Sequence, residues 1–251
     1  MSKSKNIFIT GCNRPNGIGF GLVKQMLDRY NPEHLFATCR NPADAKELNE
    51  LAANYGNLHV IELDTVDTEK FGDVVSQVDK VTGGEGINLL INNAAILEQP
   101  QSSIHQLNKD LFMKHLEVNT VAPILLTKAF LPLLEKAAAN SNSPSGIQKA
   151  AIVNISTKVA SIADNTGGGM YLYRSSKTAL NMATKCLSLE LKNKGIVTLM
   201  LHPGWVQTDL GGPNGTLTTE QSVTEMTTVI EKLGADDNGK FFNYDGQEIP
   251  W

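Results

Sequence analysis

The sequence predicts an α/β fold, in which a doubly wound, mainly parallel sheet of seven strands carries helices on both faces. Three observations support this class. Short runs of β-branched, aromatic and leucine residues alternate with longer runs whose apolar residues recur at helical spacing. The helical runs are long enough for crossovers between parallel strands. A glycine-rich turn follows the first strand-like run directly.

The first half of the chain contains four predicted strands and three predicted helices. Residues 6–10 (NIFIT) form a strand, because β-forming apolar residues follow one another there. In the helices, apolar residues return every three or four positions, as Phe71, Val74 and Val78 do. In chain order we expect a strand at 6–10, a helix at 18–29, a strand at 35–38, a helix at 43–54, a strand at 59–63, a helix at 71–78 and a strand at 88–91.

The second half opens with a long apolar helix, in which we expect Pro123 to produce a kink because proline lacks a backbone donor. The segment 203–219 is rich in glycine, proline and threonine and is expected to form a mobile loop. No repeat or change of composition marks a second domain, so residues 1–251 are expected to form one domain. In chain order we expect a helix at 108–139, a strand at 150–155, a helix at 170–194, a strand at 196–201, a helix at 222–233 and a strand at 240–244.

Composition excludes several classes of protein. The chain has 251 residues, 41% of them hydrophobic, and a net charge of −4 without a block of like charge. This composition is typical of a globular protein and disfavours a nucleic-acid partner bound by phosphate neutralisation. Residues 1–5 do not resemble a leader, and the longest apolar stretch, 121–134, is interrupted by Lys128 and Pro132. We therefore expect no membrane partner.

The cysteines and histidines predict neither a disulfide framework nor a metal site. Cys12, Cys39 and Cys186 are odd in number and widely spaced, which is typical of reduced thiols in a cytoplasmic protein. The five histidines show no metal-binding spacing, so no metal is expected.

The glycine-rich turn indicates a nucleotide site. Five residues separate Gly11 from Gly17-Ile18-Gly19, which stands at the start of a predicted helix. Glycines let the backbone approach a pyrophosphate, and the N–H groups of a helix N-terminus bind its charge. A glycine pattern alone is weak evidence, because many ordinary turns are rich in glycine.

The residues after the second predicted strand favour NADP over NAD. That strand ends in Thr38-Cys39-Arg40, without the acidic residue that binds the ribose hydroxyls of NAD in many such folds. Arg40, together with Arg14 in the glycine turn, offers a planar set of donors to a 2′-phosphate. The alternative is that both are ordinary surface arginines.

A tyrosine and a lysine stand four residues apart at the start of the helix predicted at 170–194. Tyr173 and Lys177 therefore lie on the same face of that helix. An ammonium group beside a phenol favours the phenolate, so we expect the pKa of Tyr173 to be lowered toward neutral pH. Such a phenol can act as a general acid toward a carbonyl oxygen.

Three segments give the chain a family resemblance: 10–14 (TGCNR), 169–177 (GMYLYRSSK) and 241–251. The sequence resembles the short-chain dehydrogenase/reductase family, and more narrowly its sniffer-type carbonyl reductases and C-factor relatives. The resemblance extends over essentially the whole chain. It implies a Rossmann-type fold, an NADPH cofactor and reduction of a carbonyl compound. One departure is the glycine turn, where the family has three residues between Gly11 and the next glycine and Pro15-Asn16 looks like an insertion.

The resemblance also assigns further cofactor-binding residues. Asp64 is similar to the acid that contacts the adenine amino group, and residues 92–95 (NNAA) are similar to a motif whose backbone lines the cofactor. Val206 and Thr208, after a Pro-Gly pair, match residues that hold the nicotinamide amide. The set implied in this way comprises Asn13, Asp64, Asn92, Ala94, Pro203, Gly204, Val206 and Thr208, beside Gly11, Arg14, Gly17, Ile18, Gly19, Arg40, Tyr173 and Lys177.

The catalytic set implied by the resemblance is Tyr173, Lys177, Thr157, Ser156 and Asn119. The family places a hydroxyl after the fifth strand to polarise the carbonyl, and Thr157 matches it, with Ser156 as the alternative. Strand alternation puts Ser156 and Thr157 on opposite faces, so only one can serve. Asn119 matches a residue associated with a water that links the lysine to solvent; the alternative is a satisfied buried asparagine.

These observations predict an NADPH-dependent reductase of an aldehyde, a ketone or a quinone. A second hypothesis is a sensor or signalling protein of the C-factor type that binds NADP without turnover. A third is an NAD-linked alcohol or steroid dehydrogenase, which the missing acid after the second strand disfavours. The expected partner is a small carbonyl compound, and the oligomeric state stays open between monomer and homodimer.

Overall fold

The computed structural model describes residues 6–98 and 103–251, and its seven strands form one parallel sheet in the order β3-β2-β1-β4-β5-β6-β7. The predicted fold class is therefore confirmed. The expectation that no leader begins the chain concerns residues 1–5, which lie outside the described residues. The strands are β1 (Asn6–Ile9), β2 (His34–Cys39), β3 (Leu58–Glu62), β4 (Leu89–Asn92), β5 (Ala150–Ile155), β6 (Ile196–His202) and β7 (Phe241–Asn243).

The helices also match the predicted order, with two shifted starts. A 3₁₀ turn at Pro42–Asp44, capped by Asn41, delays the second helix to Lys46. The last helix begins earlier than predicted, because Thr218 and Gln221 form a capping box before it. The helices are α1 (Ile18–Tyr30), α2 (Lys46–Asn54), α3 (Phe71–Val81), α4 (Lys109–Leu116), α5 (Ala122–Asn140), α6 (Tyr171–Leu191) and α7 (Thr219–Glu231).

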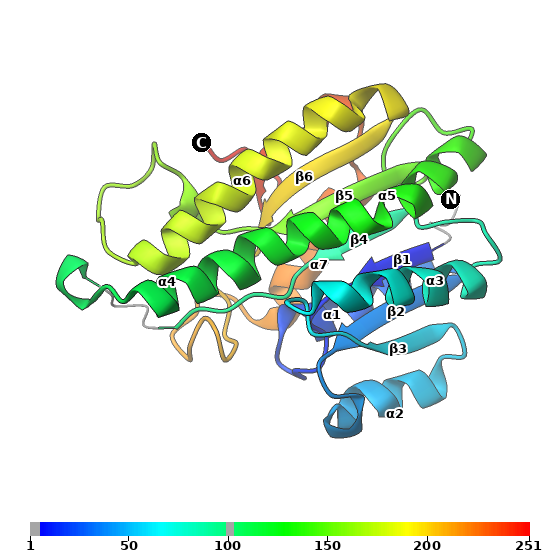
Figure 1. The fold of residues 1–251 in the computed structure, drawn as a ribbon, viewed down its shortest axis with the longest axis horizontal. Coiled ribbons are helices and arrows are strands. Elements are labelled where there is room, and N and C mark those ends of the chain that lie inside the picture. The colour runs from blue at the N-terminus through cyan, green and yellow to red at the C-terminus, as the bar shows by residue number, and fades with distance from the viewer. Residues whose placement is uncertain (1–5, 99–102) are drawn as a thin grey trace.

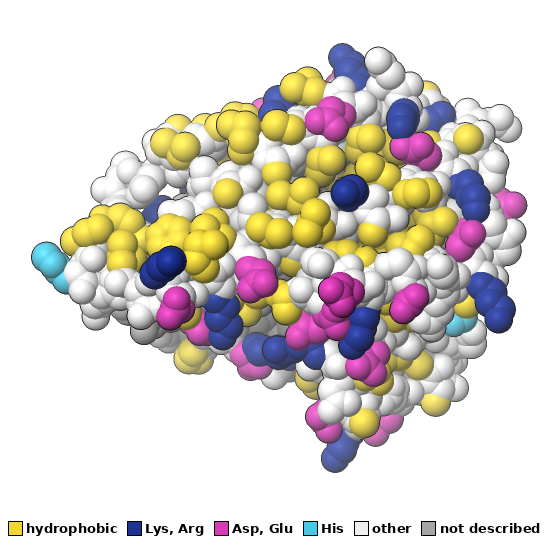
Figure 2. Space-filling view, in the orientation of Figure 1, with side chains coloured by type: hydrophobic (Ala, Val, Ile, Leu, Met, Phe, Trp, Pro, Cys, Tyr) yellow, Lys and Arg dark blue, Asp and Glu magenta, His cyan; other side chains and the backbone are white. Residues whose placement is uncertain are grey.

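Alternating side chains of the strands form two separate cores, one on each face of the sheet. Ile7 and Ile9 pack in the core that contains α1 and α7, whereas Phe8 packs in the core that contains α3 and α5. Figure 1 views the molecule from the side of α5 and α6, which lie next to each other in front of the sheet. Figure 2 shows apolar side chains across this same side. The exposed large apolar residues of the chain include Met113 in α4, Val121 in the turn after it, and Met182 and Leu189 in α6.

The long helix predicted at 108–139 is interrupted by a π-helical turn at Glu117–Val121, between α4 and α5. Pro123 follows within the first turn of α5, where a missing N–H is tolerated. The irregularity expected at Pro123 thus takes the form of a π turn just before it. The stretch Lys109–Asn140, which contains residues 121–134, is long and apolar enough to cross a membrane by length and composition alone. Here Leu126 and Phe130 bury it in the core.

The strand order reverses beside β1, which pairs with both β2 and β4. The chain builds β1, β2 and β3 in one direction and then crosses to β4 on the other side. In sheets of this kind, ligands bind outside the carboxyl ends of the strands at such a reversal. The fold therefore places the candidate site at the ends of β1, β4, β5 and β6.

Candidate active site

The turn between β1 and α1 has no room for side chains at two glycines. Gly11 has a φ of +74°, and a Cβ there would lie 3.0 Å from the Cα of Ala94. A Cβ on Gly19 would lie 2.3 Å from the carbonyl oxygen of Gly11. Gly17 is the N-cap of α1 and supplies no side-chain cap, so no capping side chain competes for the N–H groups of the first turn. Bare backbone and a helix N-terminus are what a phosphate binds.

Thr10 and Asn93, which lie in quoted motifs but were not assigned to the site, connect the ends of β1 and β4. The Thr10 hydroxyl accepts hydrogen bonds from the N–H groups of Asn93 and Ala94, over 2.9 and 3.0 Å. The Asn93 amide in turn donates to the carbonyl of Thr10 over 2.8 Å. These bonds fix the backbone of Ala94 against the glycine turn.

Asn92, predicted to line the cofactor with its backbone, has its side chain in the core. Its amide donates to Asn154 over 2.7 Å and to Thr127 over 3.0 Å, and the residue is buried. The structure therefore gives the Asn92 side chain a structural role between β4, β5 and α5.

Tyr173 and Lys177 lie in the first two turns of α6, and both are buried. The Lys177 Nζ donates to the carbonyl of Ile155, at the end of β5, over 2.8 Å. Burial lowers the pKa of Lys177 to about 7. Burial also raises the pKa of Tyr173, so the predicted lowering was wrong. The desolvation of the phenolate dominates, and the lysine is itself easily neutralised.

Ser156 and Thr157 differ in what their hydroxyls contact. The Ser156 hydroxyl is buried and donates to the side-chain amide oxygen (Oδ1) of Asn181, on α6, over 2.5 Å. The Thr157 hydroxyl makes no hydrogen bond within the described part of the chain. The turn after Thr157 is attached to α6, because Arg174 donates to the carbonyl of Val159 over 2.8 Å. Thr157 thus offers the free hydroxyl of the two.

Asn119 lies in the π turn, fully buried, and its side chain is fully used. Its oxygen accepts from the N–H of Ile96 over 2.9 Å, and its nitrogen donates to the Ile96 carbonyl and to Ser176. One turn earlier, His115 accepts from the N–H of Glu98 over 3.1 Å, with its other nitrogen 2.9 Å from the Leu111 carbonyl. Both side chains hold the segment after β4. The sequence analysis did not single out His115.

The residues predicted to bind the adenosine end are spread over three strand ends, those of β1, β2 and β3. Arg40 directly follows β2, is exposed and has no ion pair among the described residues. Asp64 follows β3 and accepts from the N–H of Val66 over 3.3 Å, so it shapes its own turn. Arg14 is exposed in the glycine turn and pairs with Asp209, while Asn13 beside it is exposed.

The segment after β6 is held by its own hydrogen bonds. Gly204 has a φ of +85°, and a Cβ there would lie 2.5 Å from a methyl group of Leu217. Val206 is buried and forms an isolated β-bridge with Leu217. The Thr208 hydroxyl accepts from the N–H of Gly211 over 3.0 Å. Thr208 therefore stabilises the loop in addition to any contact with a ligand.

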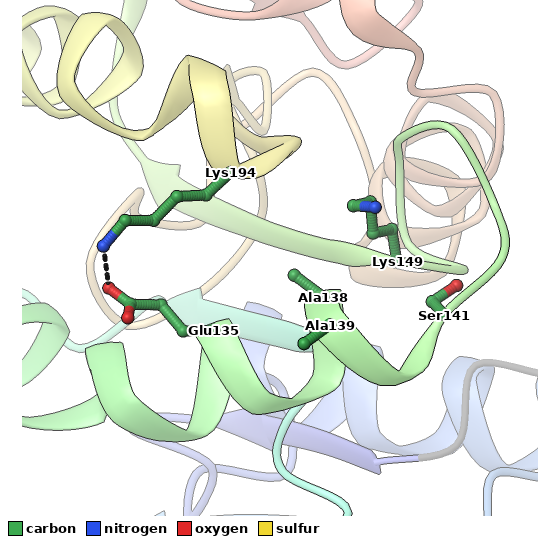
Figure 3. A pocket seen from close by; sticks show the side chains of 6 residues that line it. All are labelled: Glu135, Ala138, Ala139, Ser141, Lys149 and Lys194. Atoms are coloured by element: carbon green, nitrogen blue, oxygen red, sulfur yellow. Dashed lines mark hydrogen bonds and ion pairs between the residues drawn. The ribbon is translucent and has the colours of Figure 1, made fainter.

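A hollow elsewhere on the molecule is not part of this site. It lies where α5 ends and β5 begins, at the amino ends of the strands, and contains the ion pair between Lys194 and Glu135 (Figure 3). Lys149 and Ser141 line its other side. None of the predicted catalytic residues borders it. Within residues 6–98 and 103–251, no cluster of three metal-binding side chains occurs.

Comparison with known proteins agrees with this geometry. The family model for short chain dehydrogenases matches residues 5–216. The chain belongs to the short-chain dehydrogenase family. An oxidoreductase of Schizosaccharomyces pombe is 31% identical over the full length of both chains. The C-signal of Myxococcus xanthus is 38% identical over 165 residues, which cover 66% of this chain and 93% of C-signal.

Solved structures extend the comparison to the whole short-chain dehydrogenase fold. The carbonyl reductase Sniffer of D. melanogaster is 45% identical, with a TM-score of 0.95 over 99% of this chain and 100% of that one. A carbonyl reductase from chicken fatty liver, solved with NADPH bound, is 38% identical, with a TM-score of 0.93 and the same coverage. The chain is thus an oxidoreductase of this family by sequence and by fold.

Proposed function

We propose that the chain is an NADPH-dependent carbonyl reductase that transfers hydride to an aldehyde, a ketone or a quinone, with residues 1–251 acting as one NADP-binding domain. The observation that carries the proposal is the buried pair Tyr173 and Lys177, with the lysine fixed to the end of β5. Burying a lysine without a counter-ion is unfavourable, and such groups concentrate at functional sites.

The residues at the strand ends fit an NADP cofactor. A Cβ at Gly11 or Gly19 would collide with the neighbouring backbone, so the turn leaves its backbone bare for the pyrophosphate. Arg14 and Arg40 would hold the 2′-phosphate, and no acidic residue ends β2 to compete with them. The chicken carbonyl reductase named above was solved with NADPH, which supports the same cofactor here.

The chain's own residues supply the proton and the orientation, while the bound cofactor supplies the hydride. Tyr173 would donate its proton to the carbonyl oxygen, because its phenol is buried on the same face of α6 as Lys177. Lys177 uses one of three N–H donors on Ile155, so two remain for the nicotinamide ribose hydroxyls. The free Thr157 hydroxyl would polarise the carbonyl.

A proton relay through Asn119 would use its backbone, since its side chain is occupied by Ile96 and Ser176. Pro123 has no N–H to donate to the preceding turn, which leaves a carbonyl there without its helical partner. A water bound at that carbonyl would lead from Lys177 to solvent. The role expected for Asn119, association with a water that links Lys177 to solvent, would thus belong to its main chain.

A sensor without turnover is the second candidate, and the match to C-signal supports it. A sensor needs the glycine turn and the arginines but gains nothing from a buried Tyr173–Lys177 pair. An NAD-linked dehydrogenase is the third candidate, and the Cys39-Arg40 end of β2 disfavours it. An NADPH-dependent reductase accounts both for the buried Tyr173–Lys177 pair and for the Cys39-Arg40 end of β2.

The cysteines and the exposed apolar side chains support proposals for the cellular compartment and for the partners of the chain. Cys12, Cys39 and Cys186 are free, which supports a reducing compartment such as the cytoplasm. The partner would be a small carbonyl compound, without nucleic acid or membrane. If two copies pair, the apolar side that contains Met182 and Leu189 is the surface they would use.

The test is a screen of aldehydes, ketones and quinones in which consumption of NADPH and of NADH is followed separately. We expect turnover with NADPH, and we expect Arg40→Ala to weaken NADPH binding far more than NADH binding. Arg29→Ala, at the far end of α1, is the matched control and should alter neither. Binding of NADPH without turnover of any substrate would favour the sensor, and equal losses for both cofactors would remove Arg40 from the 2′-phosphate site.

A further inference from the structure

Two contacts connect the glycine turn to the loop after β6 and to the first residue of α7. The Arg14 Nη1 lies 3.3 Å from Oδ2 of Asp209. The Thr219 hydroxyl donates to the carbonyl oxygen of Asn16 over 2.7 Å. Arg14 and Asn16 flank Pro15, in the part of the turn that is two residues longer than the family spacing. The lengthened turn therefore reaches the loop that borders the opposite end of the site.

Both partners of the ion pair are held in place by their own backbone. The N–H of Gly17 donates to the carbonyl of Arg14 over 2.8 Å, which fixes the base of the arginine. On the other side, the N–H of Gly212 donates to the carbonyl of Thr208 over 2.8 Å, which closes a backbone turn around Asp209. The contact between Arg14 and Asp209 thus joins two ordered segments.

The Arg14 guanidinium can exchange the Asp209 carboxylate for another anion. The guanidinium has five N–H donors, and Nη1 is the one paired with Asp209. Both side chains are more than half exposed, at 55% and 65%, and exposed pairs of this kind are weak. A phosphate carries more charge than a carboxylate and accepts the guanidinium in a bidentate manner. A phosphate at this turn would therefore displace Asp209.

We infer that Asp209 is a specificity-determining residue that competes with the 2′-phosphate of NADP for Arg14. The inference rests on the proposed function, in which Arg14 binds that phosphate. Without cofactor the Asp209 carboxylate holds the guanidinium, and NADPH takes it away. NADH lacks the 2′-phosphate and leaves the pair intact. Asp209 thus reduces the preference for NADPH and releases its own loop when NADPH binds.

The test uses two probes that differ by the 2′-phosphate, namely 2′,5′-ADP and 5′-AMP, with affinities measured by calorimetry on the full chain. We expect Asp209→Asn to tighten binding of 2′,5′-ADP about two- to sixfold, because that is the change of affinity that the free energy of one exposed ion pair corresponds to. The affinity for 5′-AMP should stay unchanged. Glu220→Gln removes the same charge from the first turn of α7, without contact to Arg14, and should change neither affinity.

A double-mutant cycle separates exchange from simple repulsion. In an Arg14→Gln background, Asp209→Asn should no longer affect 2′,5′-ADP; a gain that persists there would overturn the inference. Unchanged or weaker 2′,5′-ADP binding by Asp209→Asn in the wild-type background would overturn it as well. If Arg14→Gln alone leaves 2′,5′-ADP binding intact, the failure lies in the proposed cofactor site. Unfolding temperatures of all variants control for folding.

Discussion

Lys177 is a cation in a place where water cannot solvate it. Its exposed fraction is 2%, and within residues 6–98 and 103–251 its Nζ has one hydrogen-bond partner, the Ile155 carbonyl. The spacing of Tyr173 and Lys177 could be predicted from the sequence, because i and i+4 share a helix face. The pKa of Tyr173 could not, because burial decides it and burial is a tertiary property.

The lowered pKa of Lys177 predicts a pH dependence of the reaction. If the ammonium is needed, kcat/KM for carbonyl reduction should fall as pH rises through about 7, where Lys177 loses its proton. Lys177→Arg should keep its charge and move this fall to higher pH. Lys177→Met should lower kcat/KM by about 100-fold and abolish its fall with rising pH. A wild-type profile that is flat across neutral pH would contradict this role.

Ser156 and Thr157 predict opposite effects of two small substitutions. Thr157→Val should lower kcat by about 100-fold without loss of stability, because its hydroxyl has no partner to lose. Ser156→Ala should leave kcat near that of the wild type and lower the free energy of unfolding by about 1–2 kcal/mol, since the Asn181 oxygen loses its donor. Steady-state kinetics and urea unfolding measure both. The reverse pattern would assign the polarising hydroxyl to Ser156.

At the scale of elements, the long helix shows both the success and the failure of prediction. Its extent followed from apolar spacing, and Pro123 marked an irregularity. The π turn could not be foreseen, because it depends on Asn119 reaching Ile96 in a separate segment. His115 gave no signal either, since a lone histidine among apolar residues is usually a packed core residue.

The π turn and α4 predict that His115 positions the segment after β4. His115→Ala should lower the free energy of unfolding by about 1–3 kcal/mol and raise the KM for NADPH more than it lowers kcat, because the buried Glu98 N–H loses its acceptor. Lys114→Ala is the control, since it removes only an exposed ion pair with the same Glu98. It should change stability by less than about 1 kcal/mol. Equal effects of the two variants would refute the positioning role.

At the scale of the whole molecule, the alternation of strands and helices predicted the sheet, and the glycine turn indicated at which strand ends the candidate site lies. The lateral connections escaped prediction. The bonds of Thr10 to Asn93 and the pair of Arg14 with Asp209 join residues far apart in the sequence. No local pattern encodes such contacts, because they depend on strand order and loop geometry.

Overall stability should decrease in mild acid because of two half-buried imidazoles, those of His202 and His59. Burial and the charge of Lys158 lower the pKa of His202 to about 4, from 6.5. Between these values the unfolded chain binds more protons, so the free energy of unfolding should fall as pH falls through this window, by on the order of 2 kcal/mol for His202. The lowered pKa of His59 acts in the same direction. His202→Gln should flatten the dependence in urea unfolding; an unchanged slope would refute the assignment.

The central claim is that the phenol of Tyr173 delivers the proton of a carbonyl reduction. The most direct measurement compares NADPH affinity and turnover in wild type and Tyr173→Phe, with Tyr171→Phe, an exposed phenol two residues away, as the matched control. The account predicts NADPH binding within about twofold of wild type and turnover lower by at least about 100-fold in Tyr173→Phe alone. Turnover near the wild-type rate in Tyr173→Phe would contradict it.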